Sequence, residues 1–148
     1  MTFLPPFLRL LHLVGLSLAI GAATVKVVLL LRSRNDAALL PSFFAVARPV
    51  TKLIIAGMIL LALSGTGWLL VAYDLTPLLA LKIALFACVF VLGPVIDHVA
   101  EPGFKRHAPS AGQAASPAFM RASRRYVALE IAATGLFYLI ITLWVLLA

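Results

Sequence analysis

The hydrophobic positions of this chain fall into four long runs, at about residues 7–31, 53–73, 78–99 and 126–148. Each run is close to the roughly 20 residues that a helix needs to cross a hydrocarbon layer about 30 Å thick. Polar and apolar residues do not alternate within the runs, as they would in the strands of a transmembrane barrel. Because lipid offers no partners for backbone N–H and C=O groups, each run is predicted to be helical. The pattern therefore predicts an all-α, polytopic membrane protein, with a single four-transmembrane-helix bundle domain over residues 1–148.

The composition agrees with a lipid environment. Hydrophobic residues make up 64% of the chain and charged residues 11%, whereas a soluble domain is about 45–50% apolar and about 25% charged. The chain has too few polar residues to cover the surface of a water-soluble globular domain. The lipid bilayer is therefore the first predicted partner.

The net charge of +7 is distributed unevenly along the chain. The connection at residues 73–77 carries no basic residue, while the other two connections carry nine between them: Arg32, Arg34, Arg48, Lys52, Lys105, Arg106, Arg121, Arg124 and Arg125. The positive-inside rule places these two basic connections in the cytoplasm and both termini on the external, periplasmic side. Topology and anionic lipid headgroups account for the basic residues, so no nucleic-acid partner is predicted.

The two basic connections are also expected to differ in structure. Residues Ala37 to Val46 resemble a short amphipathic helix lying at the membrane interface, with Pro49 restarting the chain into the second membrane helix. The connection from Glu101 to Arg125 is rich in proline and glycine and is expected to be the mobile segment. Pro94 is predicted to kink the third helix.

Ionisable residues within the apolar runs are the candidates for function, because charge at mid-bilayer is costly and usually faces a protein interior. His12 and Lys26 share one face of the first helix, about 21 Å apart along its axis at 1.5 Å per residue. Lys82 and Asp97 share a face of the third helix. Depth along the helices predicts two separate polar layers. The external layer contains His12 and Lys82, and the cytoplasmic layer contains Lys26, Asp97, His98 and Glu130.

These depths limit the chemistry of each layer. His12 and His98 lie on opposite sides of the bilayer, so they cannot be the two axial ligands of one haem. In the cytoplasmic layer, Lys26 is expected to pair with Glu130 or Asp97 and so neutralise buried charge. His98 is either a metal ligand or a solvated residue at the membrane edge.

Four short segments carry a resemblance to a known group of proteins: Leu8–Gly15, Thr66–Trp68, Leu81–Ile83 and Arg125–Glu130. They resemble segments of the CopD/HemJ-type four-helix bacterial membrane proteins and related small membrane families. In chain order, the matching features of that group are a first helix with a histidine, an aromatic turn, a lysine at the start of the third helix, and an arginine and a glutamate at the start of the last helix. The resemblance implies a multi-pass protein of the bacterial cytoplasmic (inner) membrane. It also implies b-type haem and oxidoreductase chemistry, or copper handling, with His12 as the haem or metal ligand and Lys82 beside it. Copper favours clusters of Met and His ligands, which the three scattered methionines do not provide.

Three functions remain open at this point. The first is a haem-binding redox protein with His12 as axial ligand. The second is a small proton-coupled transporter in which Lys26, Asp97 and Glu130 form a polar relay, and which predicts a water-filled path between the two polar layers. The third is a non-catalytic membrane subunit of a homodimer or larger complex. Whether the protein is an enzyme is also left open, and any catalysis would come from a cofactor.

Overall fold

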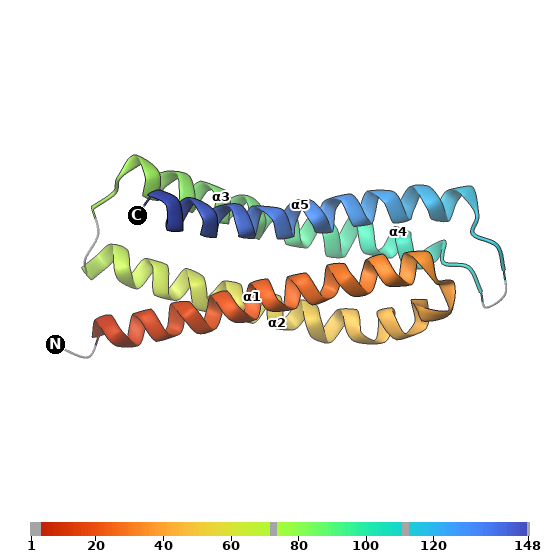
Figure 1. Cartoon of the computed structure of the whole chain (residues 1–148), viewed down its shortest axis with the longest axis horizontal. Helices are drawn as coiled ribbons and strands as arrows, with labels where there is room; N and C mark the ends of the chain where they lie inside the picture. The colour runs from red at the N-terminus through yellow and green to blue at the C-terminus, as the bar shows by residue number, and fades with distance from the viewer. Residues whose placement is uncertain (1–3, 72–73, 111–112, 148) are drawn as a thin grey trace.

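The computed structural model describes residues 4–71, 74–110 and 113–147. Within them every regular element is helical: α1 (Leu4–Asn35), the 3₁₀ turn η1 (Ala37–Leu39), α2 (Leu40–Val71), α3 (Pro77–Val95), the π-helical turn η2 (Ile96–Ala100), α4 (Glu101–Arg106) and α5 (Pro117–Leu147). The segments α3, η2 and α4 form one continuous rod. The described residues thus form an up-and-down bundle of four long rods (Figure 1).

All four rods are long and apolar enough to cross a membrane, as the sequence predicts. They are also longer than predicted. At 1.5 Å per residue, the 32 residues of α1 span about 48 Å, which exceeds a hydrocarbon layer of about 30 Å. Each rod therefore has several turns outside such a layer. Two of the predicted ends, at residues 73 and 148, lie outside the described residues.

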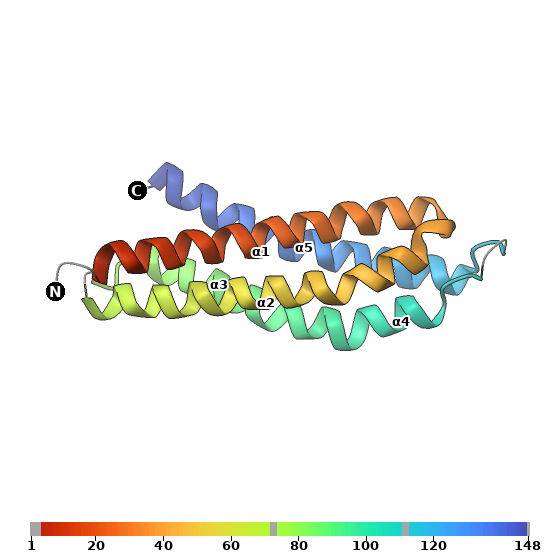
Figure 2. The ribbon, with the colours of Figure 1, turned by 90° about the horizontal axis from the view of Figure 1, so that it is seen from below.

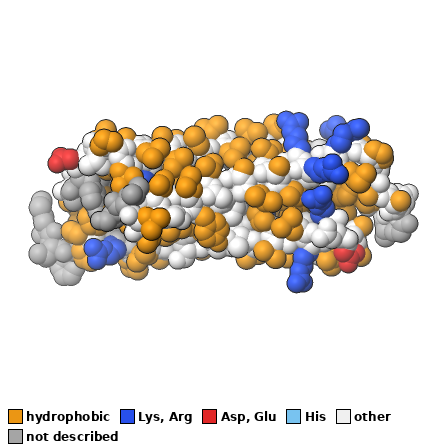
Figure 3. Space-filling view, turned by 45° about the horizontal axis from the view of Figure 1, so that its top comes forward, with side chains coloured by type: hydrophobic (Ala, Val, Ile, Leu, Met, Phe, Trp, Pro, Cys, Tyr) orange, Lys and Arg blue, Asp and Glu red, His pale blue; other side chains and the backbone are white. Residues whose placement is uncertain are grey.

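The two ends of the bundle differ in charge. Both termini lie at one end in Figures 1 and 2, which we call the terminal end. The η1 turn and the connection at residues 107–116 lie at the other end, which we call the basic end. Figure 3 shows Lys and Arg side chains gathered towards the basic end and a broad apolar surface along the middle of the bundle.

The prediction of a separate interfacial helix over Ala37–Val46 is wrong. Only Ala37–Leu39 forms a separate turn, and α2 then runs unbroken through Pro49. Proline removes one backbone hydrogen bond, but tertiary packing holds the helix on both sides of it. Phe43 and Val50 are both buried on its inner face.

The predicted bounds of the second basic connection, Glu101 and Arg125, are also wrong, because helices extend into it from both sides. Pro102 lies at the start of α4, directly after the π-helical turn η2, and the rod continues through it to Arg106. At the other end, the Ser116 hydroxyl accepts a hydrogen bond from the Phe119 N–H at 3.1 Å and caps α5, which leaves only residues 107–116 as the connection.

Small residues bring α1 and α2 into the most extensive contact between rods. A Cβ atom added at Gly57 would lie 2.5 Å from the Ala19 backbone nitrogen and 2.7 Å from the Gly15 carbonyl oxygen. The backbones of the two helices therefore touch directly, in the manner of small-residue contacts in membranes. The rods α3 and α5 form the second hairpin and lie together above α1 and α2 in Figure 1.

The buried residues form two apolar clusters. The cluster nearer the basic end is aromatic, with Phe104 stacked on Phe119 and Tyr126 at ring-centroid distances of 5.3 and 5.2 Å. The second cluster lies further along the bundle towards the terminal end and consists of Ala19, Ala23, Met58, Leu61, Val89 and Phe137. The principal polar site lies between these two layers.

Candidate functional site

Lys26 forms two ion pairs inside the bundle. Its Nζ lies 2.6 Å from Glu130 Oε1 and 3.4 Å from Asp97 Oδ1. The Lys26 side chain is 3% exposed, the Glu130 side chain 6% and the Asp97 side chain 25%. The expected pairing of Lys26 with Glu130 or Asp97 is confirmed, and the lysine contacts both carboxylates at once. We call these three residues the lysine cluster.

Each member of the lysine cluster comes from a different rod, and local sequence explains each position. Lys26 continues the buried stripe of α1 that contains Ala19 and Ala23 at three- and four-residue spacing. Glu130 lies in a similar stripe on α5. Asp97 lies in the π-helical turn η2, which begins two residues after Pro94. The kink at Pro94 stays a prediction. The π-helical turn that follows it is a feature frequent at functional sites.

Two further residues extend the lysine cluster towards the basic end, and the sequence analysis did not single them out. The hydroxyl of Tyr126, a wholly buried residue, donates to Glu101 Oε2 at 3.4 Å. Lys26 Nζ also lies 5.8 Å from the centre of the Tyr126 ring. Their spacing in the sequence could have indicated both residues, because Tyr126 is four residues before Glu130 and Glu101 is four residues after Asp97. Such pairs share a helix face once both segments are known to be helical.

The cluster and its extension concentrate acidic groups around one base. The chain has five Asp and Glu residues, and three of them, Asp97, Glu101 and Glu130, lie around Lys26 and Tyr126. Two carboxylates contact Lys26 directly, so one positive charge faces two potential negative charges. The site is therefore short of positive charge when both carboxylates are ionised.

His12 lies in a separate polar site nearer the terminal end. Its Nδ1 lies 2.9 Å from Ser64 Oγ on α2. The Ser64 Oγ also lies 3.1 Å from the Leu61 carbonyl oxygen. When the Ser64 hydroxyl donates to that carbonyl, it accepts from the Nδ1–H of His12, and in this tautomer Nε2 of His12 has a lone pair for a ligand.

Lys82 belongs to the same part of the bundle. Its Nζ lies 3.6 Å from the centre of the Trp144 ring on α5, a cation–π contact. Lys82 is also near enough to His12 to act on it electrostatically. The two residues that the sequence assigned to the external layer thus lie in one neighbourhood.

The structure does not bring His98 into the lysine cluster. His98 is exposed, and its Nδ1 bonds to the Pro94 carbonyl oxygen at 3.0 Å. His107 is exposed as well and makes the equivalent contact with the Gly103 carbonyl oxygen at 2.8 Å. Among the described residues, no group of three or more His, Cys, Asp and Glu side chains could hold a metal ion.

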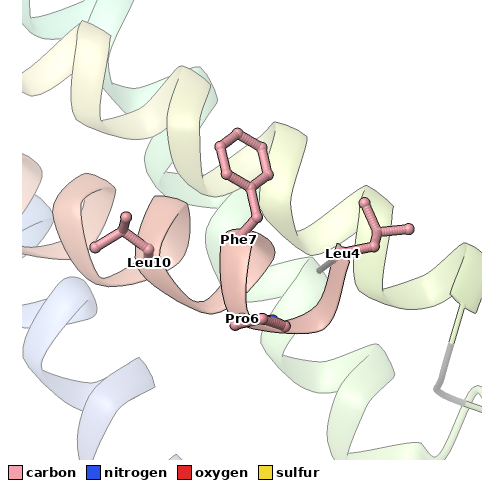
Figure 4. Close-up of a pocket in the computed structure, with 4 residues that line it drawn as sticks. All are labelled: Leu4, Pro6, Phe7 and Leu10. Atoms are coloured by element: carbon pink, nitrogen blue, oxygen red, sulfur yellow. The ribbon is translucent and has the colours of Figure 1, made fainter. Parts of the chain in front are cut away.

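Two hollows on the described surface are lined mainly by apolar residues, and neither lining includes His12, Lys82 or a member of the lysine cluster. The larger, of about 510 Å³, lies at the terminal end of α1 and is lined by Leu4, Pro6, Phe7 and Leu10 (Figure 4). The smaller, of about 260 Å³, lies between α1 and α2: its lining comes from Ser17, Leu18, Gly21, Ala22, Val25, Val50 and Leu53.

Comparison of the chain with models of known protein families, with curated proteins and with solved structures finds no match.

Proposed function

We propose that the chain is a multi-pass protein of the bacterial inner membrane, with its basic end in the cytoplasm and both termini outside. Four apolar rods support insertion. The gathering of Lys and Arg at one end supports the orientation, because cytoplasmic loops carry an excess of these residues.

Its function is proton coupling, as a small transporter or as a proton-responsive membrane subunit. The observation that carries this proposal is the buried contact of Lys26 with both Glu130 and Asp97. An unpaired charge is expensive to bury. A proton held by one of the two carboxylates balances the cluster at net charge zero, and such a proton is the chemical requirement for coupling.

The apolar cluster around Phe137 and Val89 bears on how coupling works. It lies along the bundle between the lysine cluster and His12, and its members are all apolar. This dry layer argues against the water-filled path expected for a simple relay. We infer that the lysine cluster exchanges protons with the water at the basic end. Movement of a proton from the cluster to the terminal end then requires the rods to rearrange.

Infrared spectroscopy of the protein in lipid nanodiscs tests the proposal. A protonated buried carboxyl group produces a C=O stretching band that an ionised carboxylate lacks. We expect this band at neutral pH, and we expect Glu130→Gln or Asp97→Asn to remove or shift it. The control is Asp36→Asn, because Asp36 is exposed and caps η1 through the Ala38 N–H. A wild-type spectrum without the band contradicts the proposal.

Haem binding at His12 is a second candidate, favoured by the Nε2 lone pair of the tautomer that carries its proton on Nδ1. Metal-bound histidines usually donate their other ring N–H to a fixed acceptor, and Ser64 lies in position to accept it. His12 thus fits one axial ligand, and bound haem would supply the electron-transfer chemistry. Lys82, the other residue that the resemblance places at this site, has its amino group over the Trp144 ring.

An absorption spectrum tests the haem proposal. Purified protein, or protein titrated with haemin, should show a Soret band that His12→Ala abolishes. His98→Ala is the matched control, because His98 is exposed and bonds to its own helix. Failure of the wild type to bind haemin, or a Soret band that survives in His12→Ala, contradicts the assignment.

A further inference from the structure

The buried hydroxyl of Tyr126 donates to Glu101 Oε2 at 3.4 Å. Glu130 lies one helical turn further along α5, on the same buried face of the helix as Tyr126. We propose that Tyr126 and Glu101 are proton-transfer residues that connect the lysine cluster to the water at the basic end. This inference rests on the proposed proton-coupling function and adds the route by which the proton enters and leaves.

The positions of the residues along the rods support such a route. Tyr126 is one helical turn nearer the basic end than Glu130, and Glu101 is one turn nearer that end than Asp97. Exposure follows the same direction, since Glu130 and Tyr126 are buried while Glu101 is partly exposed. Glu130, Tyr126 and Glu101 thus lie in sequence from the buried cluster to the surface.

The ring of Tyr126 is packed among aromatic side chains. Its ring stacks on Phe104 and lies edge-on to Phe43 at a centroid distance of 6.4 Å. Phe104 is wholly buried and Phe43 nearly so. The charged groups that face Tyr126 from the packed elements are Lys26 on α1, Asp97 on η2, Glu101 on α4 and Glu130 on α5.

The transfer step is balanced without a further reactant. The protonated carboxyl group of Glu130 donates its proton to Tyr126 Oη, and the O–H bond of Glu130 breaks as a new O–H bond forms on the tyrosine. The original hydroxyl proton of Tyr126 passes to the ionised carboxylate of Glu101. Tyr126 ends as a neutral phenol, Glu130 as a carboxylate and Glu101 as a carboxylic acid that loses its proton to water. Reversal of the same steps reloads the cluster.

A purely structural hydrogen bond is the competing explanation of the contact, and exchange kinetics distinguish the two. The experiment transfers full-length protein in nanodiscs from H₂O to D₂O at fixed pH. It follows the rate at which the buried carboxyl C=O band shifts on deuteration. Tyr126→Phe retains the aromatic ring and removes only the hydroxyl, and Glu101→Gln retains an acceptor but cannot take up the proton.

We expect both variants to keep the band and to slow its exchange on the order of a hundredfold, the usual contribution of one positioned proton-transfer group. Tyr138→Phe is the control, because that hydroxyl bonds to Thr24 on an exposed face at 2.9 Å. An exchange rate equal to wild type in Tyr126→Phe and in Glu101→Gln overturns the route and leaves the proposed function standing. Absence of the band from wild-type protein overturns both.

Discussion

Replacement of Lys26 by methionine is the sharpest perturbation of the lysine cluster. Methionine fills a similar volume and keeps the flexible apolar stem. The substitution removes the positive charge that lies 2.6 Å from Glu130 and 3.4 Å from Asp97. Both carboxyl groups then lose their partner within the bundle.

The burial of the three side chains sets the size of the effect. Lys26 and Glu130 are 3% and 6% exposed, so their pair behaves as a buried ion pair. Removal of one partner from such a pair typically costs about 3–5 kcal/mol. Asp97, with 25% exposure, keeps contact with the solvent and contributes less. Under conditions in which Glu130 is ionised, its buried charge has no partner in the variant, and we expect Lys26→Met to lower the free energy of unfolding by about 3–5 kcal/mol.

Reversible unfolding in mixed detergent micelles, followed by far-UV circular dichroism, measures this change. Lys52→Met is the control, because Lys52 is an exposed lysine on α2 and its loss should change stability by less than about 0.5 kcal/mol. The double variant Lys26→Met/Glu130→Leu should return close to wild-type stability, since replacing both members of a buried pair with apolar residues is often neutral. A single variant within about 1 kcal/mol of wild type, or a double variant as unstable as the single one, would contradict the assignment of Lys26 and Glu130 as a buried ion pair.

Three other predictions concern packing. Gly57→Ala should destabilise the bundle by about 1–3 kcal/mol, because its Cβ would meet the α1 backbone at 2.5 Å. Gly65→Ala on the same helix meets no atom within 4 Å and should be neutral or more stable by up to about 1 kcal/mol, so equal effects would contradict the packing. Phe104→Ala should cost about 3–5 kcal/mol in the same unfolding assay, as the residue is wholly buried and stacked on two rings; a loss under about 1 kcal/mol would show that the aromatic cluster is loose. Trp144→Leu should cost about 1 kcal/mol through its cation–π contact, and a double-mutant cycle with Lys82→Met should show coupling, whereas additive losses would exclude it.

If Lys26→Met is destabilised and Lys26→Met/Glu130→Leu is as stable as wild type, folding stability alone does not explain the charged residues of the lysine cluster. A bundle that is equally stable with methionine and leucine at two of the three positions would retain the ions for another reason. The proton exchange that we propose would be such a reason, and the infrared experiments measure it directly. Stability and spectroscopy of the same variants thus separate a structural from a functional role.

Hydropathy along the chain was sufficient to predict four long helices. An apolar run of about 20 residues has no stable alternative in lipid, because every backbone N–H and C=O group must find a partner within its own helix. The ends of the helices were predicted less well. Beyond the apolar runs, the helices continue because tertiary contacts stabilise them, as around Phe43 and Phe104, and hydropathy does not report such contacts.

Hydropathy and helical periodicity predicted the helical class, the four long rods and the position of each ionisable residue along its rod, since rise per residue is constant along a helix. Position and face were enough to predict the pairing of Lys26 with Glu130 or Asp97. How the rods are rotated about their axes, and which side chains then meet, depended on the tertiary structure. The tertiary structure brings both carboxylates to Lys26, places the Tyr126 hydroxyl against Glu101, and leaves His98 at the surface. The physical reason is that helical periodicity fixes neighbours within one rod, whereas contacts between rods depend on close packing of all their side chains together.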